Sequence, residues 1–361
     1  RDSVASRGLG DVYKRQPLSY MQLPYKILGA PGSPYSRKLR AAIRYRRLPY
    51  IWSNRNGSED VNTPDVPVNL LPVLVLPGEN GDYQQAKIDS TPILRYLENV
   101  HKERSLIPSN PIMGFLDYLI EDYGDEWLTK AMFHYRWSHQ ENIDFARSII
   151  PLWLKTDAPM ADIESMAEYF STRQIERLKY VGSNETTGQF IEETYIRFLN
   201  LLDHHLIGRR FILGNRPGCG DFGIFGQLTQ LAQTDPTSRE VSLKKVPRIY
   251  AWCDNVEDLS GMEPKEEDWL QVDAIPESLI ALLKEIGKTY VPYLIANNTA
   301  LEAGQEQWEA EINGSVWAQA SFPYQAKCLA WIREEFSKLT DEDQKTLADL
   351  LEKTDCRSLI H

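Results

Sequence analysis

A strand-like run, a tight turn and a helix-like run follow one another near the start of the chain. Residues 25–28 are strand-like, residues 29–32 (Gly-Ala-Pro-Gly) are typical of a turn, and a helical pattern follows from residue 37. The segment 33–36 (Ser-Pro-Tyr-Ser) therefore opens a helix, where the first-turn N–H groups and the positive end of the dipole favour an anion. The Ser33 hydroxyl can cap this helix or donate a hydrogen bond to a thiolate of another molecule, and these four residues alone favour neither role.

Residues 1–16 are expected to be foreign to the fold. Residues 6–16 match an in-frame translation of a transposase sequencing adaptor. We therefore interpret residues 1–16 as an artefactual leader, of the kind found in metagenomic reading frames, and exclude them. A natural basic arm is the alternative, and Met21 is a candidate native start.

The charge balance argues against two classes of partner. The chain has a net charge of −11, and the leader carries four basic and two acidic residues, which leaves −13 on the remaining body. Such a balance argues against nucleic acid and against an anionic membrane as partners. We also expect neither a transmembrane span nor a secretory segment.

The cysteines and histidines predict neither disulfides nor a metal site. The four cysteines lie far apart without a C-x-x-C pair, as expected for reduced core thiols of a cytoplasmic protein. They are Cys219, Cys253, Cys328 and Cys356. The six histidines show no recognised ligand spacing, and His134 and His139 are poorly spaced to meet on one helix, so we expect no metal.

Length and pattern predict two domains and an extension, at residues 22–104, 108–260 and 261–361. In the first domain we expect strands at 25–28, 50–52, 73–76 and 84–88, and helices at 36–45 and 90–100. In the second we expect helices at 112–139, 143–154, 161–181, 189–207, 221–232 and 245–257. In the extension we expect helices at 276–296, 326–339 and 341–351, and a β-hairpin near 308–318 around the pair Asn313 and Gly314.

Three motifs in the first domain carry a family resemblance. They are the segment 33–40, the Leu-Leu-Pro-Val-Leu segment 70–74 and the segment 89–97, which begins Asp-Ser-Thr-Pro. In this order they resemble the N-terminal domain of the cytosolic glutathione transferase family, of the serine type and bacterial-like. The resemblance implies an α/β plus all-α fold, with a thioredoxin-like first domain containing a mixed sheet and a helical bundle as the second. The extension matches nothing in the ordinary family architecture.

The resemblance also implies a site for glutathione as co-substrate. In the family the proline at the position of Pro72 is cis, so that Leu71 would offer its N–H and C=O to the cysteinyl part of glutathione. Asp89 and Ser90 would hold the γ-glutamyl amine and carboxylate, with Ser90 capping the helix, although the family often has Glu or Gln at position 89. An ordinary proline at a strand start and a simple Asp-Ser cap are the alternatives.

With these motifs downstream, thiolate stabilisation becomes the favoured role of Ser33. A thioredoxin-like fold keeps its redox dithiol at positions 33 and 36, but this chain has serine at both, so the thiol must come from the bound peptide. A hydroxyl hydrogen bond and the helix end would lower the pKa of that thiol, and the thiolate would attack an electrophile. Ser36 and Tyr35 are weaker candidates for the same contact.

The electrophile site is expected between the two domains. Tyr35, Tyr123, Trp127 and Arg136 are its candidate residues, although the helical spacing of Tyr123 and Trp127 favours core packing. Glu126 and Arg136 form a candidate internal ion pair.

Two further features concern folding and charge. Gly218 and Asp221 resemble the family's N-capping box, usually S/T-x-x-D, but glycine at the cap position leaves the cap side chain missing. Arg37, Lys38 and Arg40 would attract the anionic peptide or form a solvated face, and the solvated face is favoured for at least two of them.

The predicted function is a glutathione transferase that acts on a small-molecule electrophile in detoxification. We expect no metal, no nucleic acid and no membrane partner, and a homodimer is compatible with the resemblance. A non-catalytic binding or scaffold protein on the same fold is the alternative, whereas the missing thiol argues against a glutaredoxin-like reductase. The extension would close over the substrate cleft, form a surface appendage or make a subunit contact through its aromatic residues Trp308, Trp317, Phe322, Tyr324 and Trp331.

Overall fold

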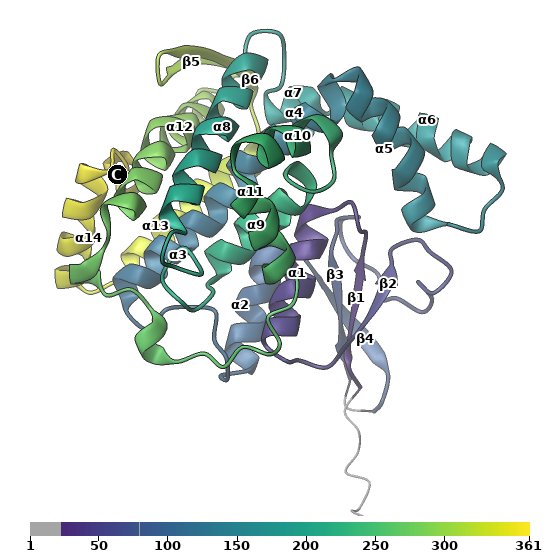
Figure 1. Cartoon of the computed structure of the whole chain (residues 1–361), viewed down its shortest axis with the longest axis horizontal. Helices are drawn as coiled ribbons and strands as arrows, with labels where there is room; N and C mark the ends of the chain where they lie inside the picture. The colour runs from purple at the N-terminus through teal and green to yellow at the C-terminus, as the bar shows by residue number, and fades with distance from the viewer. Residues whose placement is uncertain (1–22, 79) are drawn as a thin grey trace, which may run out of the picture.

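The computed structural model describes residues 23–78 and 80–361 (Figure 1). The adaptor-like leader 1–16 and Met21 lie outside the described residues, so both interpretations stay predictions. Figure 1 shows a small sheet at one end of the molecule, with helices making up most of the rest.

The N-terminal part of the described chain forms a mixed sheet. Its strands are β1 (Tyr25–Gly29), β2 (Tyr50–Asn54), β3 (Val73–Pro77) and β4 (Tyr83–Ile88), in the order β2-β1-β3-β4. β1 is parallel to β2 and antiparallel to β3, and β3 is antiparallel to β4. This arrangement confirms the predicted thioredoxin-like domain.

The helices α1 (Pro34–Tyr45) and α2 (Ser90–Val100) complete this domain. β1, α1 and β2 form a β-α-β unit, in which a helix connects two parallel strands. Ile27 of β1 and Leu74 of β3 are register partners and belong to the same buried core as Leu39 of α1 and Ile93 of α2. Burial of these apolar side chains fixes both helices against the sheet.

The helical region that follows is more interrupted than its pattern predicts. Its helices are α3 (Pro111–Tyr123), the π-helical turn η1 (Gly124–Leu128), α4 (Thr129–Ser138), α5 (Gln140–Leu154), α6 (Met160–Glu176), α7 (Leu178–Val181), α8 (Gly188–His205), α9 (Cys219–Leu231), α10 (Pro236–Lys245) and α11 (Pro247–Val256). The predicted continuous helix 112–139 is therefore wrong, because η1 interrupts it and it ends at Ser138. The sequence analysis also missed α10.

α9 lies at the centre of the bundle and is buried along its whole length against α1 and α3. The Asp221 carboxylate accepts the backbone N–H of Gly218 at 2.9 Å and that of Ile212 at 2.9 Å. Asp221 thus closes the start of α9 and joins it to the preceding loop, which is the folding role that the sequence predicts.

The cap side chain that Gly218 lacks is replaced by Asp117 of α3. The Asp117 carboxylate accepts the backbone N–H of Cys219 at 3.1 Å and that of Gly220 at 2.9 Å. A Cβ at Gly218 would lie 2.1 Å from Asp117 Oδ1. Glycine therefore stands at the cap position because a carboxylate from another helix fills the space of the usual cap.

The C-terminal extension is helical with one hairpin. Its elements are η2 (Glu266–Asp268), η3 (Val272–Ala274), α12 (Glu277–Glu302), β5 (Gln307–Ile312), β6 (Ser315–Ala320), α13 (Pro323–Ser337), α14 (Asp341–Lys353) and η4 (Arg357–Ile360). β5 and β6 pair antiparallel around Asn313 and Gly314, whose φ angles are 47° and 78°. This left-handed pair is the turn that the Asn-Gly signal predicts.

The extension packs into the same core as the helical bundle. α12 lies against α8, and α13 lies against α3. Trp317 of the hairpin and Trp127 of η1 are both buried, with ring centroids 5.3 Å apart. Among the helices in the described part of the chain, none combines the length and apolar composition that a bilayer crossing needs.

Candidate functional site

The strand register brings three of the predicted motifs to one end of the sheet. Leu28 of β1 pairs with Val73 of β3, and Val73 pairs with Ile88 of β4. Because these three residues form one row across the sheet, the segments that flank the row leave the sheet together. They are the turn before Ser33, the Leu71–Pro72 pair and the Asp89–Ser90 pair.

The Leu71–Pro72 peptide bond is cis. Within the described residues, neither the N–H nor the C=O of Leu71 has a hydrogen-bond partner, and the residue is only half-buried. A half-exposed backbone donor and acceptor beside a sheet suit an extended peptide, which would pair with them as an added strand does.

Asp89 has an unusual backbone at the start of α2. Its φ is 71° and its ψ is 119°, and its side chain makes no cap hydrogen bond. Ser90 is the first residue of α2, not its cap as the resemblance implies. Since a positive φ is costly for a non-glycine residue, the simple Asp-Ser cap does not explain this conformation.

Ser33 is the N-cap of α1. Its Oγ accepts the backbone N–H of Ser36 at 3.2 Å, and the residue is half-buried. Across the described residues the Ser33 hydroxyl has no acceptor, so its proton is free for another partner. A serine hydroxyl accepts and donates at the same time, and the two roles considered for Ser33 are therefore compatible.

The two alternative hydroxyls of the motif are less accessible, since one is buried and the other is already a donor. Ser36 is buried, and its Oγ accepts the N–H of Ala30 at 3.2 Å. The Tyr35 hydroxyl donates to the Asp125 carbonyl at 2.9 Å and lies 3.3 Å from Thr129 Oγ1. Burial, with Glu126 and Asp125 adding to it, raises the pKa of Tyr35 well above its ordinary value.

Arg136 holds the turn that precedes Ser33. Its Nη1 donates to the Gly32 carbonyl at 3.0 Å, and its Nη2 donates to Gln230 Oε1 at 2.7 Å. Its Nε donates to Asp235 Oδ1 at 2.8 Å, so Arg136 pairs with Asp235 and not with Glu126 as predicted. Arg136 is thus a buried support behind the site.

Trp153, near the end of α5, lies directly against the turn, and the sequence analysis did not single it out. A Cβ at Gly32 would lie 2.4 Å from Cζ3 of the Trp153 ring. Asn54 at the end of β2 donates to the Trp153 carbonyl at 2.8 Å. A half-buried aromatic ring therefore stands next to Ser33.

Tyr123 and Trp127, two of the predicted electrophile residues, are packed inside the protein. Both are buried, and the extension supplies their neighbours. The Tyr123 ring lies 6.0 Å from that of Tyr290, and the Trp127 ring lies 5.6 Å from that of Tyr293. Their predicted contact with a substrate remains untested, and in this structure they are packing residues.

The extension reaches the proposed site through two consecutive residues of α13. The Tyr324 hydroxyl donates to Asp89 Oδ2 at 2.8 Å. Gln325 Nε2 donates to Glu126 Oε2 at 3.0 Å. Both contacts join segments far apart in the sequence, and no local sequence pattern indicates either of them.

A buried charge network lies behind the site. Lys38 Nζ lies 2.5 Å from Asp125 Oδ2 and 2.6 Å from Glu121 Oε1. Burial opposes the charge of Lys38, but the two carboxylates hold its pKa above the ordinary value. Lys38 is therefore neither solvated nor available to attract a peptide, and the neighbouring Arg37 and Arg40 pair with a single carboxylate, that of Glu257.

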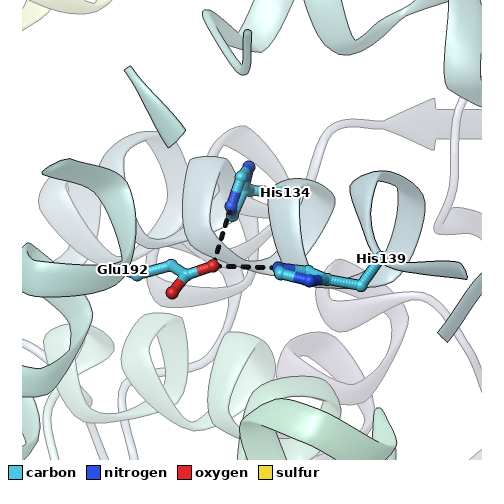
Figure 2. Close-up of side chains that lie close together, drawn as sticks. All are labelled: His134, His139 and Glu192. Carbon is cyan, nitrogen blue, oxygen red and sulfur yellow. Dashed lines mark hydrogen bonds and ion pairs between the residues drawn. The ribbon is translucent and has the colours of Figure 1, made fainter. Parts of the chain in front are cut away.

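Three potential metal ligands also meet, although the sequence analysis predicted no metal. Figure 2 shows His134 and His139 pointing toward the Glu192 carboxylate. Glu192 Oε1 lies 3.2 Å from His134 Nε2 and 2.9 Å from His139 Nε2. His134 and His139 would be poorly spaced on one continuous helix, but the chain breaks between α4 and α5.

Two protein-family models match the chain. The model of the glutathione S-transferase N-terminal domain matches residues 27–105, and that of the C-terminal domain matches residues 174–255. These matches support a glutathione transferase family. The extension lies outside both, and no curated protein matches the chain.

Similar solved structures include three bacterial proteins. A glutathione S-transferase of Methylobacterium radiotolerans, in complex with glutathione sulfonate, is 20% identical, with a TM-score of 0.39 over 64% of this chain and 90% of that chain. A glutathione transferase family member of Pseudomonas fluorescens, with two glutathione bound, is 17% identical, with a TM-score of 0.38 over 66% and 90%. A glutathione transferase of Burkholderia graminis, with two glutathione molecules per subunit, is 18% identical, with a TM-score of 0.39 over 74% and 90%.

Proposed function

We propose that this protein is a glutathione transferase of the serine type, which activates the glutathione thiolate for attack on a small electrophile. The observation that carries the proposal is the register row of Leu28, Val73 and Ile88. This row brings the Ser33 hydroxyl, the unpaired backbone of Leu71 and the Asp89 carboxylate to one end of the sheet. The two family models support the same assignment.

In this proposal the backbone of Leu71 binds the cysteinyl part of glutathione, and the cis bond to Pro72 turns it toward the peptide. The Asp89 carboxylate pairs with the γ-glutamyl ammonium. The γ-glutamyl carboxylate accepts hydrogen bonds from Ser90 at the positive end of α2. These contacts leave the cysteine sulfur facing the start of α1.

Ser33 then stabilises the thiolate. A free thiol has a pKa of about 8.5, and lowering it by about two units requires about 2.7 kcal/mol. The Ser33 hydroxyl donates to the sulfur, the N-terminus of α1 adds its dipole, and the thiol proton leaves to solvent. The thiolate forms a bond to the electrophilic carbon, and the leaving group departs with its bonding electrons.

The electrophile lies beside Trp153 in this proposal, since that half-buried ring is next to the Ser33 turn. Tyr35 and Arg136 border the same turn from the protein interior. Tyr123 and Trp127 stay behind them in the core and act through packing.

A non-catalytic binding or scaffold protein on the same fold is the second candidate, and one observation favours it. The Tyr324 hydroxyl already occupies Asp89 Oδ2, so a side chain of the protein uses part of the proposed ammonium site. A glutaredoxin-like reductase is disfavoured, because all four cysteines are buried.

The test combines turnover with binding. The purified protein is incubated with glutathione and a generic aryl halide, conjugation is followed by absorbance, and thermal unfolding is measured with and without glutathione. We expect turnover and a glutathione-dependent rise in Tm. A rise in Tm without turnover supports a non-catalytic binding protein, whereas the absence of both contradicts the transferase and favours a scaffold protein that does not use glutathione.

Two substitutions separate catalysis from capping. Ser33→Asp keeps a good cap acceptor but has no hydroxyl proton to donate. It should therefore lose turnover by at least about 25-fold at pH 7, because raising the thiol pKa from about 6.5 to about 8.5 lowers the thiolate fraction from about 76% to about 3%, and the added carboxylate disfavours the thiolate further. The Tm should be kept. Ser36→Ala is the matched control and should keep most activity. Full activity in Ser33→Asp would assign Ser33 a capping role alone.

A further inference from the structure

The junction between α4 and α5 brings two histidines together. α4 ends at Ser138, and His139 has φ −101° and ψ 126°, an extended conformation, before α5 begins at Gln140. In a continuous helix, side chains five residues apart point about 140° away from one another. The extended residue removes this separation, and the rings of His134 and His139 lie 5.3 Å apart.

We propose that His134, His139 and Glu192 bind one divalent transition-metal ion of the zinc class. The candidate ligand atoms all lie within 4.8 Å of one another. Zinc bonds of about 2.0–2.1 Å in a tetrahedral site place neighbouring ligand atoms about 3.3 Å apart. The two nitrogen-to-oxygen distances, 3.2 Å and 2.9 Å, are close to that value. Small side-chain movements are therefore enough to admit the ion.

The surrounding residues hold His134 in the orientation that the site needs. Its Nδ1 lies 2.8 Å from Ser183 Oγ, which leaves Nε2 facing Glu192. Hydrogen bonding of the second ring nitrogen is the usual way in which a protein orients a histidine ligand. The Ser183 hydroxyl can donate or accept, so it remains paired when the ion displaces the Nε2 proton.

Space for the ring is provided by Gly188, the first residue of α8. A Cβ at this position would lie 2.8 Å from His134 Cε1, which is too close for a carbon contact. The same helix carries Glu192 one turn later. The start of α8 thus both admits the imidazole and supplies the carboxylate.

The site is open on one side. The side chain of His134 is 8% exposed, whereas those of Glu192 and His139 are 35% and 37% exposed. An ion can enter from the side of His139, and water can complete the fourth position. Two imidazoles and one carboxylate suit zinc and its neighbours in the first transition row, while magnesium and calcium prefer oxygen ligands.

The experiment uses the full chain without an affinity tag and adds Zn²⁺ in a calorimetric titration. We expect one equivalent to bind. His139→Gln and Glu192→Gln each remove one ligand and should weaken binding by at least about 100-fold, and Ser183→Ala should weaken it by about 10–100-fold. His204→Gln, at an exposed histidine of α8, is the matched control and should bind as the unaltered protein does.

Co²⁺ gives a readout that a merely structural histidine cluster would not produce. Bound Co²⁺ should show the strong visible absorption of a four-coordinate site. This absorption should be absent in Glu192→Gln. The far-ultraviolet circular dichroism of Glu192→Gln should equal that of the unaltered protein, which shows that the variant is folded. The assignment would be overturned by absence of saturable Zn²⁺ binding or by loss of binding in His204→Gln. It would also be overturned if His139→Gln and Glu192→Gln bound Zn²⁺ as tightly as the unaltered protein.

Discussion

Tyr324 Oη donates a 2.8 Å hydrogen bond to Asp89 Oδ2, across 235 positions of sequence. Asp89 is the N-cap residue of α2 and has a positive φ and no cap hydrogen bond, so Tyr324 is the partner that orients its carboxylate in the described chain. The contact joins the extension to the pair that we propose as the γ-glutamyl site. We infer that the extension is part of that site and not a surface appendage.

Removing this hydrogen bond should weaken glutathione binding. In Tyr324→Phe the Asp89 carboxylate loses its orienting donor while the aromatic packing stays. We expect Kd for glutathione to rise by about 2–10-fold, which corresponds to a net hydrogen-bond contribution of about 0.5–1.5 kcal/mol. Titration calorimetry measures the change. Tyr180→Phe, at an exposed tyrosine, is the control and should bind normally.

A fall in the Kd for glutathione in Tyr324→Phe would change the interpretation of this hydrogen bond. Tighter binding by Tyr324→Phe would mean that the Tyr324 hydroxyl competes with the γ-glutamyl ammonium, and would favour the non-catalytic binding or scaffold protein over the transferase. An unchanged Kd would mean that the Tyr324 hydroxyl does not contribute to glutathione binding, and would contradict the inference that the extension is part of the site.

The charge of Asp89 can be tested apart from its shape. Asp89→Asn keeps the size of the side chain but cannot form an ion pair, so glutathione binding should weaken by about 10–100-fold, as for a hydrogen bond to a charged group. The comparison ligand is N-acetylated glutathione, which has no ammonium. It should bind the variant and the unaltered protein equally, and an equal loss for both ligands would contradict the proposed pairing.

The sequence predicts the parts of the fold that local signals determine. Asn313 and Gly314 adopt the left-handed angles that their turn requires. The apolar run of β3 and the proline before it identify the strand that begins beside the proposed glutathione site. Neighbouring residues decide both features, so a single sequence is enough.

The remaining features depend on residues far apart in the chain. The apolar periodicity continues on both sides of the π-helical turn Gly124–Leu128, so the sequence pattern does not reveal this turn. Neither Gly nor Pro marks the break between helices at His139. The metal candidate was missed for that reason. The glycine at position 218 was a usable signal, since it showed that the cap of α9 must come from another residue, but nothing local identified Asp117.

Because Asp117 caps α9 in place of a side chain at position 218, changes at either residue should lower the free energy of unfolding. Asp117→Ala leaves the buried N–H of Gly220 without an acceptor, whereas the N–H of Cys219 keeps the Leu106 carbonyl at 3.2 Å. We expect the free energy of unfolding to fall by about 1–3 kcal/mol. Gly218→Ser should also destabilise the protein, because its Cβ would lie 2.1 Å from Asp117 Oδ1. Urea denaturation measures both changes.

The double variant tests whether the two residues occupy one space. With alanine at position 117, a serine at position 218 has room and can cap α9 in the usual way, which contributes about 1 kcal/mol. Asp117→Ala/Gly218→Ser should therefore be more stable than the sum of the single changes predicts. Strict additivity would mean that Asp117 does not act as the cap.

The buried carboxyl group of Glu126, which contacts Gln325 of the extension, should make the stability of the protein depend on pH. Burial raises the pKa of Glu126 to about 8, and that of Asp122 to about 7. Protonated Glu126 can donate to Gln325 Oε1, a buried atom that has no partner in the described structure. Burial lowers the pKa of Lys130 to about 7, which acts in the opposite direction at higher pH.

Because the folded state binds the Glu126 proton more tightly than the unfolded chain, the free energy of unfolding should fall as pH rises from about 4.5 to about 8. Glu126→Gln removes this titration and supplies an amide donor for Gln325. Its stability should fall less steeply over that range and exceed that of the unaltered protein at pH 8, by on the order of 1 kcal/mol. Urea denaturation at a series of pH values measures both curves, and Glu185→Gln, at an exposed site, should leave the curve unchanged. Parallel curves for Glu126→Gln and the unaltered protein would show that Glu126 is ionised throughout and that the contact with Gln325 does not depend on its proton.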